Sequence, residues 1–360
     1  MSIEFKNIVK TYDQSPVLES INAEIANGEF FAIVGPSGCG KSTLLRMLAG
    51  LIDVTDGVIK IDGQTVNNVP PKDRKLTMVF QDYALFPFLT VEENIAFGLK
   101  ARKMPETEIS QRVTRAVDMV GLADFRSRKP KDLSDGQRQR IALARAIASD
   151  AKICLMDEPL SNLDAQLRDR MRTEIRALQR KLQLTLIYVT HDQIEAMTMA
   201  DHIMVLNDHH VQQIDTPLGI YNHPANEFVA NFFGSPQINF LSGSYKEHER
   251  EIVIDTKLRL PIQNQLTKEN YLVGIRPNQL DFQIAKNNGG NASLTDLTNL
   301  GSQTLLTARL DNGQQLRLTK SEQISMPINQ RIDLHLKGQA FIFDPEKKNL
   351  AAVSVGVDHG

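Results

Sequence analysis

The chain has 360 residues, of which 41% are hydrophobic and 23% are charged, a composition typical of a folded globular protein. It has 41 lysine and arginine residues against 43 aspartate and glutamate residues and no basic tract, so we do not expect nucleic acid as a partner. Two cysteines indicate no disulfide framework. Neither a signal peptide nor an apolar run of roughly 20 residues is apparent. If the protein acts at a membrane, we therefore expect it to act from the water side.

Three apolar runs in the first two thirds of the chain, at 30–34, 153–156 and 186–189, predict strands that are buried on both faces. They alternate with longer helix-like stretches, which is typical of an α/β domain with a largely parallel sheet. The segment from about 91 to 149 is helical and charged and indicates a helical insertion. Ligands of such sheets bind beyond the carboxyl ends of the strands, so the residues after each run form the candidate site.

The first run leads into the pattern G-x-x-x-x-G-K-S and then into an apolar helix, which together are typical of a phosphate-binding loop. Its glycines let backbone N–H groups cradle phosphates, and the helix amino terminus adds partial positive charge. We expect Lys41 to reach the β- and γ-phosphates of ATP and the Ser42 hydroxyl to bind Mg²⁺. The alternative is a glycine-rich turn that spells the motif by chance, which leaves the strand and helix around it unexplained. The candidate nucleotide-binding residues are Gly35, Pro36, Ser37, Gly38, Cys39, Gly40, Lys41, Ser42 and Thr43.

The two cysteines are expected to differ in reactivity. Cys39 lies at a helix amino terminus beside Lys41, surroundings that lower the pKa of a thiol. Cys154 lies in the second apolar run and is expected to be buried.

Polar residues also follow the other two runs. Asp157 is expected to hold Mg²⁺, and Glu158 is expected to polarise the attacking water as a general base. His191 follows the third run, and we expect it to contact the γ-phosphate. A purely structural histidine is the alternative there.

The composition changes around 234–236 to short alternating segments punctuated by Gly, Pro and Asn, which predicts a small all-β barrel domain. The expected segments are 251–260, 271–275, 279–284, 304–310, 331–336 and 339–343, with a turn at 287–290.

The segment Leu133–Arg140, with the helix that follows it to Ala148, resembles the signature motif of ATP-binding-cassette (ABC) ATPases. The phosphate loop, Asp157–Glu158, Ser161–Asp164 and His191 stand in the order of that family. The resemblance implies that residues 1–235 form an α/β P-loop ABC ATPase domain with a helical subdomain at about 88–150. It also implies a homodimer in which ATP lies between the phosphate loop of one copy and the signature of the other.

The resemblance adds further site residues, namely Gln81 as a catalytic and Mg²⁺-binding residue, Tyr12 as a platform for adenine, and Ser134, Gly136 and Gln137 as contacts to the ATP of the second copy. Two positions depart from the family pattern. Asp135 replaces a signature glycine, and we expect its side chain to point away from phosphate and to help cap its own helix. Asn162 stands where alanine is common, and activity is expected to survive both changes.

The segments Tyr83–Pro87, Thr190–Met197 and Gly234–Phe240 are similar to those of ATPases from bacterial solute importers, especially importers of maltose, other oligosaccharides or glycerol phosphate. Val273–Pro277 resembles a hallmark of their carboxy-terminal OB-like regulatory domain, which is expected at 236–360. ATPases of polyamine and ferric-iron importers, and a soluble ABC ATPase with a regulatory role, are the alternatives. The aromatic run at 83–88 is either a contact to membrane subunits or ordinary core.

The importer resemblance also implies partners and a location. The partners are transmembrane permease subunits, an extracytoplasmic solute-binding protein that acts indirectly, and a regulatory protein at the carboxy-terminal domain. The location is the cytoplasmic face of the cell membrane. The transported solute is not readable, because specificity lies in other subunits.

Overall fold

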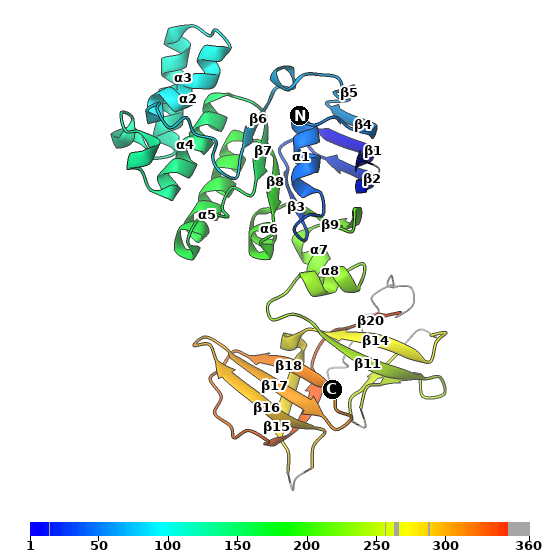
Figure 1. Cartoon of the computed structure of the whole chain (residues 1–360). Helices are drawn as coiled ribbons and strands as arrows, with labels where there is room; N and C mark the ends of the chain where they lie inside the picture. Colours follow the sequence, from blue (N-terminus) through cyan, green and yellow to red (C-terminus); the bar gives the residue numbers. More distant parts are fainter. Residues whose placement is uncertain (14, 256, 263–265, 287–288, 345–360) are drawn as a thin grey trace. The chain divides into compact units, whose positions relative to one another are not determined.

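Figure 1 shows the computed structural model of the chain, which describes residues 1–13, 15–255, 257–262, 266–286 and 289–344. Contacts divide the chain into two compact units, Met1–Leu218 and Gly219–Gly360. The domain boundary expected at 235/236 lies further along the chain and stays a prediction. Residues 287–288 of the expected turn, and 345–360 of the expected β domain, lie outside the described residues. Within the described ranges no helix is long and apolar enough to cross a membrane.

The first unit is built on a six-stranded sheet with the order β10-β9-β3-β8-β7-β6, in which only the β10–β9 pair is antiparallel. Every residue of β3, β7 and β8 is buried, which confirms the three buried strands predicted from the apolar runs. The strands are β3 (Phe30–Val34), β6 (Leu76–Val79), β7 (Ile153–Asp157), β8 (Thr185–Thr190), β9 (His202–Asn207) and β10 (His210–Asp215).

An antiparallel sheet, which was not predicted from the sequence pattern, completes the first unit. Its order is β2-β1-β4-β5, and the register between β1 and β2 shifts repeatedly. The buried residues of β1 are Ile3, Phe5 and Ile8, so their spacing changes from two to three at the first shift. The alternation that marks a strand in a sequence is therefore interrupted. The strands are β1 (Ile3–Tyr12), β2 (Ser15–Ile25), β4 (Asp56–Ile61) and β5 (Gln64–Thr65).

Helices cover the parallel sheet on both faces. α1 (Lys41–Ala49) lies between the two sheets and shares one apolar core with both (Figure 1). On the opposite face, Phe30 and Tyr188 pack in a second core with Met171 of α5 (Ala165–Leu182). The burial of the strands on two sides follows from these layers.

The helical insertion expected between about 91 and 149 is present. It consists of α2 (Val91–Ala101), α3 (Glu106–Met119) and α4 (Asp135–Ala148). α2 and α4 each begin with a capping box, in which the side chains of the cap residue and of the third helical residue satisfy backbone N–H groups. Short 3-10 turns lie at Pro71–Asp73, Ala123–Phe125 and Pro130–Asp132, and α6 (Gln193–Met199) follows β8.

The aromatic run before α2 divides between core and surface. Tyr83 is buried, whereas Phe88 is 84% exposed. Phe86 lies between these extremes, and its ring centroid is 4.2 Å from that of Phe97. The buried side chain of Asn94 accepts a hydrogen bond from the Phe86 backbone N–H and donates to its carbonyl, which fixes the turn.

The second unit contains two five-stranded antiparallel sheets, with the orders β13-β12-β11-β14-β20 and β15-β19-β16-β17-β18. The expected segment 251–260 holds two short strands rather than one, and β11, β16 and β18 were not predicted. The strands are β11 (Asn239–Lys246), β12 (Glu251–Val253), β13 (Arg259–Pro261), β14 (Asn270–Ile275), β15 (Leu280–Ile284), β16 (Ala292–Asn299), β17 (Thr304–Leu310), β18 (Gln315–Lys320), β19 (Arg331–Leu336) and β20 (Ala340–Phe343), with a 3-10 turn at Pro277–Gln279.

Two short helices, α7 (Pro217–Asn222) and α8 (Glu227–Phe232), precede these sheets. Arg276, which is 3% exposed, donates to the carbonyls of Phe233 at 2.6 Å and Tyr221 at 2.7 Å. Its guanidinium also lies 3.7 Å from the centre of the Tyr221 ring. The segment around α8 is therefore bound into the second unit.

Candidate nucleotide site

The loop between β3 and α1 has a backbone that only glycine can supply at two points. Gly35 has a φ of +156°, and a Cβ there would lie 2.0 Å from the carbonyl oxygen of Leu206. Gly40 has a φ of +99°, and its Cβ would lie 2.9 Å from the carbonyl oxygen of Val17. A residue with a side chain would therefore clash at both positions, and only glycine fits there. Within the predicted phosphate loop, Gly35, Cys39, Gly40 and Lys41 are buried, Ser42 and Thr43 are half-buried, and Pro36, Ser37 and Gly38 are exposed.

Lys41 turns back into this loop. Its Nζ donates to the carbonyl of Gly35 at 2.9 Å and to that of Pro36 at 2.8 Å. The ammonium group is thereby held beside the loop backbone and at the amino terminus of α1. Positive charge and backbone N–H groups are concentrated where the sequence predicts the phosphates.

Ser42, in the first turn of α1, and Asp157, at the end of β7, bring two oxygen ligands together. The Ser42 hydroxyl donates to Asp157 Oδ1 at 2.6 Å, and the carboxylate is 4% exposed. Arg46 lies 3.7 Å from the same carboxylate. Hydroxyl and carboxylate oxygens suit Mg²⁺, which uses few protein ligands when phosphates supply the others. The described residues hold no cluster of three or more His, Cys, Asp or Glu side chains that could bind a metal.

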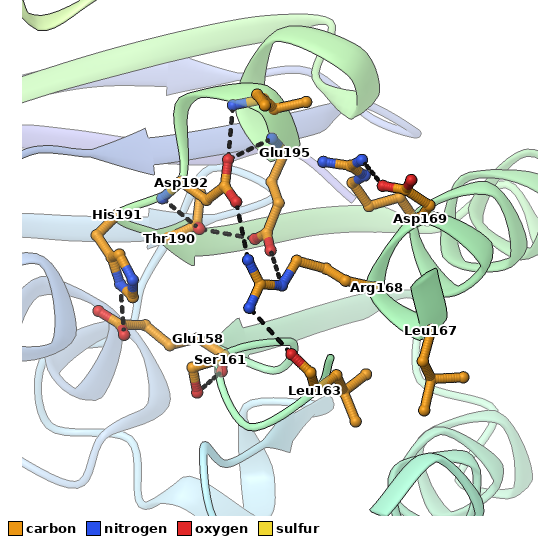
Figure 2. Close-up of polar contacts among 12 residues, drawn as sticks. Glu158, Ser161, Leu163, Leu167, Arg168, Asp169, Thr190, His191, Asp192 and Glu195 are labelled. Carbon is orange, nitrogen blue, oxygen red and sulfur yellow. Dashed lines mark hydrogen bonds and ion pairs between the residues drawn. The ribbon is translucent and has the colours of Figure 1, made fainter. Parts of the chain in front are cut away.

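Glu158 and His191 lie at the ends of neighbouring parallel strands. β7 pairs with β8 such that Asp157 lies opposite Val189, and the Glu158 N–H donates to the Val189 carbonyl at 3.0 Å. Figure 2 shows the imidazole of His191 directed at the Glu158 carboxylate, with 2.9 Å between Nδ1 and Oε2. The structure thus joins the expected general base to the expected γ-phosphate contact.

Gln81 is tied to this edge through its backbone. Asn162 donates from Nδ2 to the Gln81 carbonyl at 3.1 Å, and the Gln81 side chain is exposed. The asparagine that departs from the family pattern therefore connects the loop after β7 to the segment after β6.

The signature residues lie at the start of α4. Ser134 accepts from the Gln137 N–H at 3.4 Å, while the Gln137 side chain accepts from the Ser134 N–H at 3.0 Å. At Gly136, a Cβ would lie 2.6 Å from Leu167 Cδ2, so α4 approaches α5 closely there. Among the described residues, no hydrogen bond or ion pair joins Ser134, Gly136 or Gln137 to the phosphate loop of the same chain.

Asp135 is a surface residue of the first turn of α4. Its carboxylate pairs with Arg138 at 2.9 Å, and the side chain is 54% exposed. Ser134, not Asp135, provides the cap of the helix. The expected stabilisation of α4 by Asp135 therefore comes from this ion pair and from its charge near the helix amino terminus.

Tyr12 ends β1 and is 46% exposed. The Lys10 ammonium lies 4.6 Å from the centre of its ring. An exposed ring of this kind can stack on a base, and no described contact joins it to the phosphate loop.

The expectation of a lowered thiol pKa at Cys39 was wrong. Burial raises the pKa of Cys39, and this effect outweighs the opposing effects of Lys41 and of nearby backbone N–H groups. Burial raises the pKa of Cys154 further, to about 12. Both thiols are free and buried.

Known proteins match both units. A family model described as "ABC transporter" matches residues 18–161, and one described as "TOBE domain" matches residues 273–343. The oligosaccharides import ATP-binding protein MsmX of Bacillus subtilis is 47% identical over 86% of this chain and 88% of its own length. The sn-glycerol-3-phosphate import ATP-binding protein UgpC of Ruegeria pomeroyi is 54% identical over 68% of this chain and 70% of its own length.

Solved structures agree with the fold. The structure of cbiO1 from Clostridium perfringens, part of the ABC transporter complex cbiONQ, covers 61% of this chain and 89% of its own, with 28% identity and a TM-score of 0.57. The dimeric post-hydrolysis structure of the ATP-binding cassette MJ0796, bound to ADP and Pi, covers 60% and 98%, with 32% identity and a TM-score of 0.54. These matches confirm the predicted ABC ATPase fold and the β-rich OB-like domain that follows it. The chain belongs to the ABC transporter family, as one of its ATP-binding and ATP-hydrolysing subunits.

Proposed function

We propose that this chain powers the import of a carbohydrate or a glycerol phosphate through a membrane ABC transporter. The observation that carries the proposal is the meeting of Lys41, Ser42, Asp157, Glu158 and His191 at the carboxyl ends of β3, β7 and β8. Two of the relatives, an oligosaccharide and a glycerol-3-phosphate import protein, support the class of solute.

Each residue has a role that its position supports. Lys41 neutralises charge on the β- and γ-phosphates, and the backbone of Gly35–Thr43 cradles them. Glu158 accepts a proton from the attacking water, and His191 beside it contacts the γ-phosphate. Tyr12 stacks on adenine. Ser42, Asp157 and Gln81 would hold Mg²⁺, which when bound neutralises developing negative charge on the phosphates.

The proposed assembly is a homodimer. In the head-to-tail arrangement, Ser134, Gly136 and Gln137 of one copy face the ATP in the phosphate loop of the other. The dimeric form of the cassette matched above supports this arrangement. ATP then closes the dimer, and hydrolysis opens it.

The proposed location is the cytoplasmic face of the cell membrane. The chain would bind transmembrane permease subunits there and act indirectly on an extracytoplasmic solute-binding protein. Its second unit, which matches the TOBE domain, would offer the surface for a regulatory protein.

An uptake assay tests the class of solute. A strain that lacks the gene for this chain is supplied with labelled oligosaccharides, glycerol 3-phosphate, a polyamine or ferric iron, and complemented with wild type or Glu158→Gln. We expect loss of uptake for a carbohydrate or glycerol phosphate, restored by wild type alone. Loss confined to polyamine or iron uptake would contradict the proposal.

A further inference from the structure

Glu195 of α6 lies behind the Glu158–His191 pair and fixes the end of β8. Its side chain is 4% exposed, and Oε2 accepts from the Tyr188 hydroxyl at 2.8 Å and from the Thr190 hydroxyl at 2.7 Å. Figure 2 shows the carboxylate directed at Thr190, the residue that precedes His191. One buried carboxylate thus holds the strand end that leads into His191.

Asp192 fixes the chain on the other side of His191. Its Oδ1 accepts from the Ile194 N–H at 2.7 Å and caps α6, and its own N–H donates to the Thr190 hydroxyl at 3.0 Å. Its Oδ2 remains for a partner outside this turn, and that partner is Arg168, with 3.4 Å between Nη1 and Oδ2. His191 therefore lies between two residues whose side chains are both bound.

Arg168 connects this turn to the loop that follows Glu158. It lies in the first turn of α5, and its Nη2 donates to the Leu163 carbonyl at 3.0 Å. Its Nε lies 4.0 Å from Glu195 Oε1. A planar guanidinium can reach Leu163, Asp192 and Glu195 at once, which a lysine ammonium on a flexible stem cannot do in the same geometry.

The charge of Arg168 suits its position beside the buried carboxylate of Glu195. A buried carboxylate is stable only when it is paired or well hydrogen-bonded, and Glu195 has two hydroxyl donors and the nearby guanidinium of Arg168. Arg170, two residues further along α5, is exposed and forms no ion pair with the described residues. Arg170 therefore provides a control arginine on the same helix, outside the interactions that join Arg168 to Asp192 and Glu195.

We propose that Arg168 is a positioning residue for ATP hydrolysis, which holds the loop after Glu158 and the turn around His191 at a fixed spacing. It acts through His191, whose imidazole it keeps against the Glu158 carboxylate, and it does not itself touch the nucleotide. This inference rests on the proposed roles of Glu158 and His191.

A double-mutant cycle tests the inference in the full-length chain. ATP hydrolysis is measured for Arg168→Met, Asp192→Asn and the control Arg170→Met. Each substitution is made both in the wild-type protein and in His191→Ala. Variants that turn over slowly are measured with radiolabelled ATP under single-turnover conditions. Asparagine keeps the cap of α6 but replaces the Oδ2 acceptor by an amide N–H₂, so Asp192→Asn breaks the link without removing Arg168. Thermal melting establishes whether each variant is folded. If Arg168→Met does not fold, the hydrolysis measured for Asp192→Asn decides the test.

We expect Arg168→Met and Asp192→Asn each to lower kcat about tenfold while the KM for ATP changes less than about threefold. In the His191→Ala background the same changes should cost less than about twofold, because residues that act through one another are not additive. Arg170→Met should leave the rate of ATP hydrolysis unchanged relative to its own background, both in the wild-type and in the His191→Ala protein.

Equal losses in the two backgrounds, or no loss in the wild-type background, would overturn the role of Arg168. A failure of the proposed function is recognised separately. If Glu158→Gln hydrolyses ATP at the wild-type rate, the site itself is misassigned, whatever Arg168 does.

Discussion

Glu158 and His191 are in contact through side chains alone, with 2.9 Å between Oε2 and Nδ1, and each follows directly from a buried strand. If Glu158 accepts the proton of the attacking water, Glu158→Gln should bind ATP normally and lose about 10²–10⁴-fold in turnover, because the amide cannot act as a base. The measurement is steady-state hydrolysis together with ATP affinity from a fluorescent nucleotide. Size-exclusion chromatography with ATP should also show a longer-lived dimer for this variant. Turnover within a few fold of wild type would exclude Glu158 from the proton transfer.

The two thiols give a second prediction at the residue scale. Burial raises both pKa values, to about 12 at Cys154, while Lys41 and backbone N–H groups oppose the increase at Cys39. We expect a maleimide to label both slowly, Cys39 faster than Cys154, and saturating ATP to slow the labelling of Cys39. Cys39→Ser and Cys154→Ser variants assign the two rates by mass spectrometry. Identical Cys39 rates with and without ATP would argue against the placement of the phosphates at this loop.

The sequence predicted residues whose chemistry is local, and it predicted burial along the apolar runs, but it did not predict burial that depends on distant parts of the chain. The Ser42–Asp157 contact joins residues that were both expected at Mg²⁺, because strand, loop and helix were in register. The lowered pKa expected at Cys39 was wrong because desolvation depends on side chains that pack over it from elsewhere in the chain. Arg168 and Glu195 were missed for the same reason, since only tertiary structure brings them to Leu163 and Asp192.

At the scale of elements, the contact of α6 with β8 through Glu195 makes the free energy of unfolding depend on pH. Burial raises the pKa of the Glu195 carboxyl above its ordinary value of 4.5. Between that value and the raised one, the folded state retains a proton that the unfolded state has released, so the free energy of unfolding falls as pH rises through this window. Glu195→Gln has no such proton. We therefore expect wild type to lose stability relative to the variant as pH rises from 4.5, which urea unfolding at a series of pH values measures. Parallel stability curves for the two proteins would contradict this.

Elements were predictable where burial is uniform and unpredictable where register changes. β3, β7 and β8 are buried along their whole length, so an unbroken apolar run marks each one. In β1, buried and less buried residues alternate only as far as Phe5, where the register with β2 shifts, so the pattern that marks a strand in a sequence is lost. β12 and β13 have three residues each and were predicted as one segment, because strands of three residues carry little periodicity of their own.

At the scale of the whole molecule, the position of a truncation decides whether the remaining chain folds. Every residue with a proposed role in ATP hydrolysis precedes Leu218, so a chain that ends there should bind ATP within about threefold of full length. A chain that ends at Gly234 would keep α8 but lose Ile238, Phe341 and Phe343, which share a core with Ala230. It would also lose Arg276, which binds the Phe233 carbonyl.

We therefore expect the chain that ends at Gly234 to aggregate more than the chain that ends at Leu218, because it exposes apolar side chains of α8. Size-exclusion chromatography and light scattering compare the two. A folded chain ending at Leu218 that does not bind ATP would move the nucleotide site out of the first unit.

The pairing of β7 with β8 has a consequence for how this protein can evolve. The spacing of Glu158 and His191 follows from the parallel register that places Asp157 opposite Val189, and not from the lengths of surface loops. Insertions and substitutions at the surface can accumulate without altering that spacing, since a sheet buried on both faces does not adjust to them. Changes in the surface loops therefore leave the spacing of Glu158 and His191 unchanged.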